Sequence, residues 1–233
     1  MIGDVGPGGG IIFYDCDADN VGDTGTGADN LSSLVAGWQY LEASPYDVRA
    51  YTDPKTNSTV TGISDLELPA QYYFGYSRNI DDGSNLYVNG SSEYSFSNCT
   101  RLEIGSGLEN TNKIVSSYGN STYTFSSGTN KTNLYAANVC KNLEYGGKDD
   151  WFLPSRDELK ELYNQRDLFD SYKEYPYAYA FRQEDYGYCS SSEGYTANET
   201  GDGLYAFFVE FETGLELSNL KSTNRFIRPI RRF

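Results

Sequence analysis

The chain has 233 residues, enough to bury roughly 70% of its unfolded surface in one large domain or two small ones. Its 18 basic residues are outnumbered by 33 acidic ones, and the formal net charge of −15 repels nucleic-acid phosphates and anionic membranes at long range. Aromatic residues make up 15% of the chain, including 22 tyrosines, which excludes a disordered tail. The charge argues against nucleic-acid binding. No apolar run is long enough to span a bilayer, so we also expect no membrane insertion.

Histidine is absent, and this removes more chemistry than any other feature of the composition. No Ser-His or Cys-His nucleophile pair can form, and no imidazole is present to bind zinc, copper or haem iron. Carboxylates are numerous, but the sequence singles out no pair of them for acid–base catalysis. We therefore expect a protein that is not an enzyme and that carries no cofactor or metal. A carboxylate-based hydrolase is the catalytic alternative, and it requires two acids in one cleft.

The four cysteines are widely spaced and form no CxxC pair, so neither a zinc ribbon nor a thioredoxin-type dithiol is indicated. We expect Cys140 and Cys189 to be small buried apolar groups, because free cysteine is among the most buried residue types. One or two disulfides remain an open alternative. The chain from Met1 to Asp4 leads into glycines without basic residues or an apolar core, so we expect no signal peptide.

Two short strands are predicted in the first fifty residues, one over 11–14 and one over 37–43. Between them lies an acidic, glycine-rich loop in which Asp15 opens a D-x-D-x-D series like the start of a calcium loop. Asn20 replaces the expected glycine, and Thr26 stands where a bidentate glutamate belongs. A solvated acidic loop is therefore the preferred interpretation.

The stretch from 48 to 103 is polar, rich in Tyr, Ser, Asn and Gly, and without helical periodicity. This composition predicts an inserted lobe of short strands and loops. A helix is predicted after it, because apolar residues recur at every third position from Leu134 to Leu143, and the stripe ends at Gly146-Gly147.

A second helix is predicted after Pro154. Ser155 and Glu158 have the spacing of a capping box at its N-terminus. Its buried face is expected to consist of Leu159, Leu162 and Tyr163. The three apolar residues 151–153, between the two helices, are predicted to form a short strand or an anchor in the core.

Strands return after residue 172, with predicted runs at 204–211, 215–217 and 225–233. Pro229 places the last run at a sheet edge or a bulge. The serine triplet at 190–192 is interpreted as a structural turn rather than a nucleophile, because no base is available. Strands at both ends and helices in the middle predict an α+β fold with the two termini close together.

Several ordered motifs resemble one known family. They are Gly6-Pro7-Gly8-Gly9-Gly10-Ile11-Ile12-Phe13-Tyr14, Gly37-Trp38-Gln39-Tyr40-Leu41-Glu42-Ala43, Gly105-Ser106-Gly107, Asp150-Trp151-Phe152-Leu153-Pro154-Ser155, Ser190-Ser191-Ser192-Glu193 and Arg228-Pro229-Ile230-Arg231. In order and spacing they resemble the Lcl C-terminal domain family. This resemblance implies a C-type lectin-like fold with two helices, paired N- and C-terminal strands and inserted loops. It makes 1–233 a single domain with insertions at about 16–36 and 48–103.

The sequence departs from this family and its relatives at two points. Cys189 stands where the family usually has tryptophan, so the packing there is expected to differ. The formylglycine-generating enzymes share a related fold, but their cysteine-containing catalytic segments have no counterpart in this sequence. Fold kinship therefore does not imply an oxidase.

Domains of this type also serve as the variable proteins of diversity-generating retroelements, in which reverse transcription randomises adenines near the 3′ end of the gene. That resemblance implies a rigid scaffold whose C-terminal segment forms a hypervariable face. The face would bind a protein or glycan ligand on a cell surface, and the protein would be displayed on a virion or cell, as in phages, archaeal viruses and bacteria. The alternative is an invariant adhesin or carbohydrate-binding domain, in which tyrosines stack on sugars and Asp and Asn bind hydroxyls, with or without calcium.

A randomised Asn codon with a pyrimidine third base can become Tyr, Asp, Ser, Gly, Thr, Leu, Phe or Val, but not Glu, Lys, Gln, Trp or Met. This filter gives the candidate ligand-binding positions Tyr186, Tyr188, Gly194, Tyr195, Thr196, Asn198, Asp202, Leu204, Phe208, Leu215, Leu217 and Asn219. It predicts that Glu193, Glu210, Glu212, Glu216 and Lys221 are fixed.

The candidate positions differ in how strongly they favour the surface. We expect the tyrosines at 186, 188 and 195 to be exposed, because tyrosine gives a large contact area at small entropic cost. Phe208, Leu215 and Leu217 are either binding positions or core strand residues. Strand alternation places the odd positions 215, 217 and 219 on one side of the sheet and Glu216 and Ser218 on the other.

Four of the eighteen basic residues lie at the end of the chain, at positions 225, 228, 231 and 232. In a strongly acidic molecule these arginines are expected to pair with carboxylates and anchor the last strand rather than bind an anion.

Overall fold

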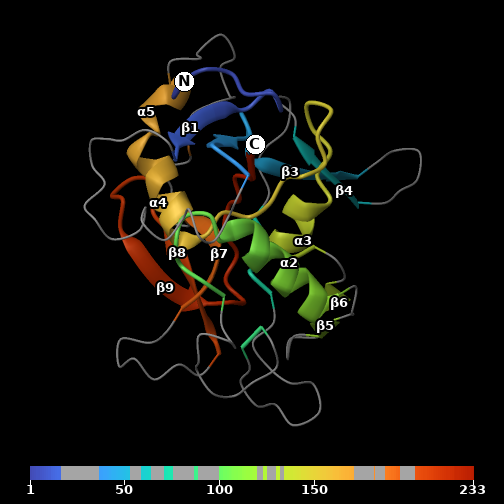
Figure 1. Cartoon of the computed structure of the whole chain (residues 1–233). Coiled ribbons are helices and arrows are strands. Elements are labelled where there is room, and N and C mark those ends of the chain that lie inside the picture. Colours follow the sequence, from blue (N-terminus) through green and yellow to red (C-terminus); the bar gives the residue numbers. More distant parts are fainter. Residues whose placement is uncertain are drawn as a thin grey trace.

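The computed structural model describes residues 1–16, 37–52, 59–63, 71–75, 87–88, 100–119, 123–124, 130–131, 134–170, 181, 187–194 and 203–233. Helices and small antiparallel sheets are mixed along the chain, as predicted for an α+β protein (Figure 1). The acidic loop beyond Cys16 and most of the stretch predicted as an inserted lobe lie outside the described residues.

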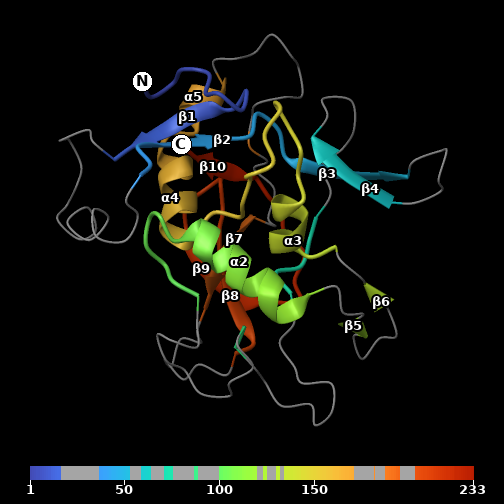
Figure 2. The same ribbon diagram turned by 45° about the vertical axis from the view of Figure 1, so that its right-hand side comes forward.

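One three-stranded sheet joins the two ends of the chain. It contains β1 (Ile11–Asp15), β2 (Tyr40–Ala43) and β10 (Ile230–Arg232) in the order β1-β2-β10, all antiparallel. The predicted strands at 11–14 and 37–43 and the closeness of the termini are confirmed, and Figure 2 shows both ends beside this sheet. Pro229 directly precedes β10, which pairs with β2 on one side and forms an isolated bridge from Ile230 to Phe152 on the other.

A second three-stranded sheet is formed late in the chain. It contains β7 (Tyr188–Glu193), β8 (Tyr205–Val209) and β9 (Glu216–Leu220) in the order β7-β8-β9, again antiparallel. In Figure 1, β9 runs along the lower left rim of the molecule, below α4. Among the described residues, β9 is therefore the edge strand of this sheet.

The serine triplet lies inside β7, so its interpretation as a turn is wrong. Serine is tolerated in a fully buried strand here because each hydroxyl has a hydrogen-bond partner. Ser190 Oγ donates to the carbonyl of Phe207 at 2.8 Å, and Ser192 Oγ donates to the carbonyl of Arg101 at 2.7 Å. The side-chain amide of Asn110 donates to Ser191 Oγ at 3.2 Å.

Two hairpins complete the strands. One pairs β3 (Val48–Thr52) with β4 (Thr59–Ile63), and the other pairs β5 (Tyr123–Thr124) with β6 (Asn130–Lys131). Both lie on the α3 side of the molecule in Figures 1 and 2. The β3–β4 hairpin falls in the stretch where short strands were predicted.

Helix α4 (Arg156–Asn164) begins where the sequence predicts, and both bonds of the capping box are present. Ser155 Oγ accepts from the Glu158 backbone N–H, and the Glu158 carboxylate accepts from the Ser155 backbone N–H at 2.7 Å. Leu159 and Leu162 are fully buried, whereas Tyr163 is only partly buried. A short helix, α5 (Asp167–Asp170), follows directly.

Helix α3 (Ala136–Lys141) is shorter than the predicted run and ends well before Gly146-Gly147. Five of its six residues are buried, so the protein surrounds this helix on nearly every side. The apolar side chains at every third position therefore belong to a core helix rather than to a surface helix with one buried face. Leu143 is buried just beyond its end, and the two glycines adopt positive φ in the turn that follows.

Helix α2 (Gly107–Tyr118) was not predicted. Its buried face contains Asn110 and Thr111 beside Ile114 and Tyr118, so the apolar stripe on which the periodicity argument depends is interrupted. Thr111 Oγ1 accepts from the Leu153 backbone N–H at 3.0 Å, which shows how a polar residue is satisfied at this buried position.

Two hydrophobic clusters form the core on either side of the β7–β8 strands. One joins α2 and α3 to Cys189 and Ala206, and the other joins β1, β2 and α4 to Tyr188 and Val209. The predicted apolar anchor before α4 is confirmed, since Trp151, Phe152 and Leu153 are all buried. No helix within the described ranges has the length and apolar character needed to cross a membrane.

Candidate ligand-binding face

The edge strand β9 and the turn before it expose apolar side chains. Leu215 is 53% exposed, Leu217 36% and Leu220 43%. The other large hydrophobic side chains exposed in the described ranges belong to the first five residues. These leucines are the exposed large apolar side chains of this sheet, but Leu217 and Leu220 lie on opposite sides of β9.

The two sides of β9 have different surroundings, as strand alternation predicts. Leu217 pairs with Phe208 and Asn219 pairs with Ala206, so these four residues lie on one side of the sheet, which we call the β9 face. Leu217 and Asn219 are at least partly exposed there, whereas Ala206 and Phe208 are buried.

The opposite side of β9 carries Glu216 and Ser218 and packs toward α4. Glu216 Oε2 lies 3.3 Å from Arg156 Nε, and its Oε1 lies 3.5 Å from Lys160 Nζ. The Arg156 guanidinium lies 5.2 Å from the centre of the Phe207 ring on the same side. The register confirms that Leu217 and Asn219 lie on one side of β9 and Glu216 and Ser218 on the other. Exposure does not separate the two sides, because Glu216 and Leu220 are exposed as Leu217 is, and Ser218 is partly buried as Asn219 is.

Tyr188 is fully buried, so its predicted surface position is wrong. The strand points this side chain into the core beneath α4, where its ring centre lies 4.6 Å from that of Phe211. Its hydroxyl donates to Asp47 Oδ2 at 2.9 Å. A buried ring with a satisfied hydroxyl supports the core rather than binding a ligand.

Gly194 is also buried, and a Cβ at this position would lie 2.4 Å from Ser218 Oγ. A larger residue would therefore need the Ser218 side chain to move. Leu204 is partly buried, and its carbonyl accepts from the Lys221 backbone N–H at 2.8 Å. The structure does not place Gly194 or Leu204 as freely exposed positions.

Phe208, Leu215 and Leu217 were predicted to be either binding positions or core residues, and the structure separates them. Phe208 is 6% exposed and is a core residue, covered by the Arg225 guanidinium at 4.1 Å from its ring centre. Leu215 and Leu217 are surface residues. Five further candidates lie outside the described residues: Tyr186, Tyr195, Thr196, Asn198 and Asp202.

A buried ion pair fixes the ends of the strands behind the β9 face. Lys221 and Glu193 are both almost completely buried, and the Lys221 ammonium donates to Glu193 Oε1. The same carboxylate accepts backbone N–H groups from Val88 at 2.8 Å and from Thr100 at 3.1 Å. Both members of the pair are predicted to be fixed, and the structure gives each a role in holding the framework.

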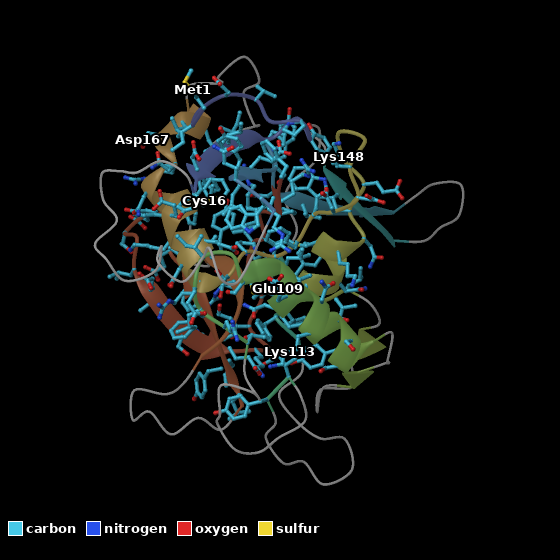
Figure 3. The ribbon with its side chains drawn as sticks, in the orientation of Figure 1. Met1, Cys16, Glu109, Lys113, Lys148 and Asp167 are labelled. Carbon is cyan, nitrogen blue, oxygen red and sulfur yellow. The ribbon has the colours of Figure 1, made fainter. Side chains whose placement is uncertain are left out.

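Three of the four C-terminal arginines pair with carboxylates, as expected. Arg228 contacts Asp47 at 2.7 Å, Arg231 contacts Glu42 and Asp150 at 2.6 Å each, and Arg232 contacts Glu109 of α2 at 3.1 Å, a residue labelled in Figure 3. The Arg231 guanidinium lowers the pKa of Asp150. For Arg225 the expectation is wrong, because no ion pair joins it to a carboxylate in the described part of the chain.

The thiols lie away from this face or behind it. Cys140 and Cys189 are free and buried, as predicted, and burial raises the pKa of Cys189 to about 12 and that of Cys140 well above its usual value. Cys16, labelled in Figure 3, donates to the Trp38 carbonyl at 3.3 Å. In the ranges that the structure describes, no three acidic or cysteine side chains gather into a set that would hold a metal ion.

A scan against protein-family models finds no family that matches this chain. A search of curated proteins also finds no match.

Proposed function

We propose that this protein is a ligand-binding display protein with a C-type lectin-like fold, whose C-terminal segment is diversified by a retroelement. The single observation that carries the proposal is the division of β9. Leu217 and Asn219, which the codon filter allows to vary, share one side of the strand, and Leu215 is exposed in the turn before it. Glu216, which the filter predicts to be fixed, lies on the other side and is held by two cations of α4.

The framework behind this strand supports the same proposal. A binding face that changes between gene copies requires a scaffold whose stability does not depend on the changing side chains. Here Glu193, Lys221 and Arg228 are buried in ion pairs, and the β7–β8 strands are packed between two hydrophobic clusters. Variation at positions 215, 217 and 219 leaves these contacts untouched.

The chemistry of the exposed side chains favours a protein ligand over a glycan. Sugar rings are bound mainly by stacking on aromatic side chains, whereas aliphatic side chains suit apolar protein surfaces. Within the described ranges the large hydrophobic side chains exposed along β9 are all leucines. We place the protein on a virion or cell surface, where a variable face meets cell-surface proteins.

The experiment is to sequence this gene and its neighbourhood across related genomes. The proposal predicts a reverse transcriptase gene and a near-copy of the last coding segment, with differences between the copies confined to adenines of the template. The differing codons should include 215, 217 and 219, while codons 193 and 221 stay constant. Sister genes that are identical through this segment, or that differ equally at 193 and 221, would overturn the proposal.

A further inference from the structure

Arg225 lies between β9 and β10 in the chain, at the β7 edge of the sheet, where the next residue, Phe226, pairs with Tyr188. Its side chain covers Phe208 on the β9 face. Its guanidinium lies 4.1 Å from the centre of the Phe208 ring, and Phe208 is the residue paired with Leu217. The side chain therefore lies on the same side of the sheet as Leu217. Only 7% of the residue is exposed, so it is also largely removed from water.

The guanidinium is mostly unpaired. Nη1 donates to the carbonyl of Asn224 at 2.9 Å, which is the only hydrogen bond of this side chain among the described residues. Nε is enclosed and has no partner. No carboxylate of the described chain lies within 4.0 Å, and Glu210 attracts the guanidinium only from beyond that distance. Arg228 and Arg231 on the same C-terminal segment, in contrast, are each paired with carboxylates.

A buried guanidinium without a counter-ion is costly, because a charge removed from water needs a partner to replace its hydration. Nε and Nη2 make no hydrogen bond with the residues that the structure describes, and they lie on one edge of the planar group. This edge matches the two oxygens of a carboxylate, which accept parallel hydrogen bonds from it. This edge therefore suits a planar anion, and no carboxylate of the described chain binds it.

The surroundings favour one source for that anion. Phe208 lies beneath the guanidinium and pairs with Leu217 on the next strand, so one side of the site is apolar. A charged hydrogen bond is stronger there than in open water. The net charge of −15 repels acidic ligands at a distance, but this repulsion is screened beyond about 8 Å at physiological ionic strength. A single carboxylate within a mostly apolar contact surface satisfies both conditions.

We propose that Arg225 receives the carboxylate of an aspartate or glutamate side chain presented by a protein ligand bound to the β9 face. This inference rests on the proposed binding function of that face. It makes Arg225 a fixed anchor beside variable positions, so that ligands of different shape share an acidic residue at one point.

The test is a titration of the whole protein with N-acetyl-aspartate N-methylamide, followed by the 15N NMR signal of Arg225 Nε–H. The neutral asparagine analogue is the matched probe, and glucuronic acid represents an acidic sugar. We expect a saturable shift with the aspartyl probe. A charged hydrogen bond contributes about 1.5–3 kcal/mol, so the asparagine analogue should bind roughly 10 to 100 times more weakly.

Variants separate the arginine from general charge effects. Binding followed by backbone amide signals should be lost in Arg225→Gln and weakened at least about tenfold in Arg225→Lys, because an ammonium lacks the two-pronged edge. Arg166→Gln is the control, since it removes a more exposed arginine that lies between α4 and α5. This control should leave the aspartyl response unchanged. Thermal unfolding of each variant shows whether a lost response reflects lost folding.

Several results would overturn the inference: no saturable shift, equal binding of the asparagine analogue, or unchanged binding by a folded Arg225→Gln protein. Tighter binding of glucuronic acid than of the aspartyl probe would overturn the protein source. The proposed function is tested separately, by comparing the sequences of sister genes. If those genes vary as proposed but the aspartyl probe does not bind, only the role of Arg225 is lost.

Discussion

At the scale of single residues, the buried charges of this protein fall into those with partners and those without. Glu158 belongs to the first group, since its carboxylate accepts N–H groups from Gly105 at 2.9 Å and from Ser155 at 2.7 Å. The carboxylate thereby connects the segment before α2 to the start of α4. Burial nevertheless outweighs these bonds and raises the pKa of Glu158 from 4.5 to about 7.

This raised pKa predicts a pH dependence of stability. Between pH 4.5 and about 7 the folded state holds a proton on Glu158 that the unfolded state has released, so the free energy of unfolding falls as pH rises through this window. The stabilisation is complete below pH 4.5 and lost above about 7. We expect the wild-type protein to lose about 3 kcal/mol relative to Glu158→Gln across the window, measured by urea unfolding. Parallel pH profiles for the two proteins would contradict this.

The Lys221–Glu193 pair predicts a different behaviour, because both charges are buried together. Lys221→Met should destabilise the fold by about 3–5 kcal/mol, since it leaves the Glu193 carboxylate buried without its cation. The double variant with Glu193→Gln should recover most of this loss, because the uncompensated charge is removed. The measurement is a double-mutant cycle in urea. Additive single and double effects would show that the two charges are not coupled.

At the scale of elements, the parts that sequence predicts well are those whose signal is local. The N-terminus of α4 is predicted because a capping box needs only Ser155 and Glu158 at the correct spacing. The terminal strands are predicted because their apolar runs are short and bounded by glycine and proline. Helix α2 was missed because Asn110 and Thr111 occupy its buried face and are satisfied by distant backbone groups.

The candidate site shows the same limit. Alternation along β9 correctly separates Leu217 from Glu216, since it depends on strand geometry alone. Tyr188 was misplaced because its burial depends on Asp47, which is distant in sequence and accepts its hydroxyl. The unpaired state of Arg225 is likewise invisible in sequence, where it resembles the three paired arginines that follow it. Pairing over long sequence distances has no local signal.

At the scale of the whole molecule, the two core clusters and the buried ion pairs surround the β7–β8 strands, while β9 forms the rim. Under the proposed function, this arrangement would separate the residues that stabilise the fold from those that bind a ligand. Side chains of β7 and β8 make the contacts that hold the fold, and side chains of β9 are exposed or partly exposed. A change on the rim is therefore expected to alter binding with little effect on folding, whereas a change behind it unfolds the chain.

The most direct test of this separation is a comparison of two libraries in a display format that scores folded protein by protease resistance. One library randomises Leu215, Leu217 and Asn219 to the residues that a randomised Asn codon allows, and the matched library does the same at Tyr188, Glu193 and Lys221. We predict that most members of the first library remain protease-resistant and that nearly all members of the second do not. Equal losses in both libraries would contradict the account.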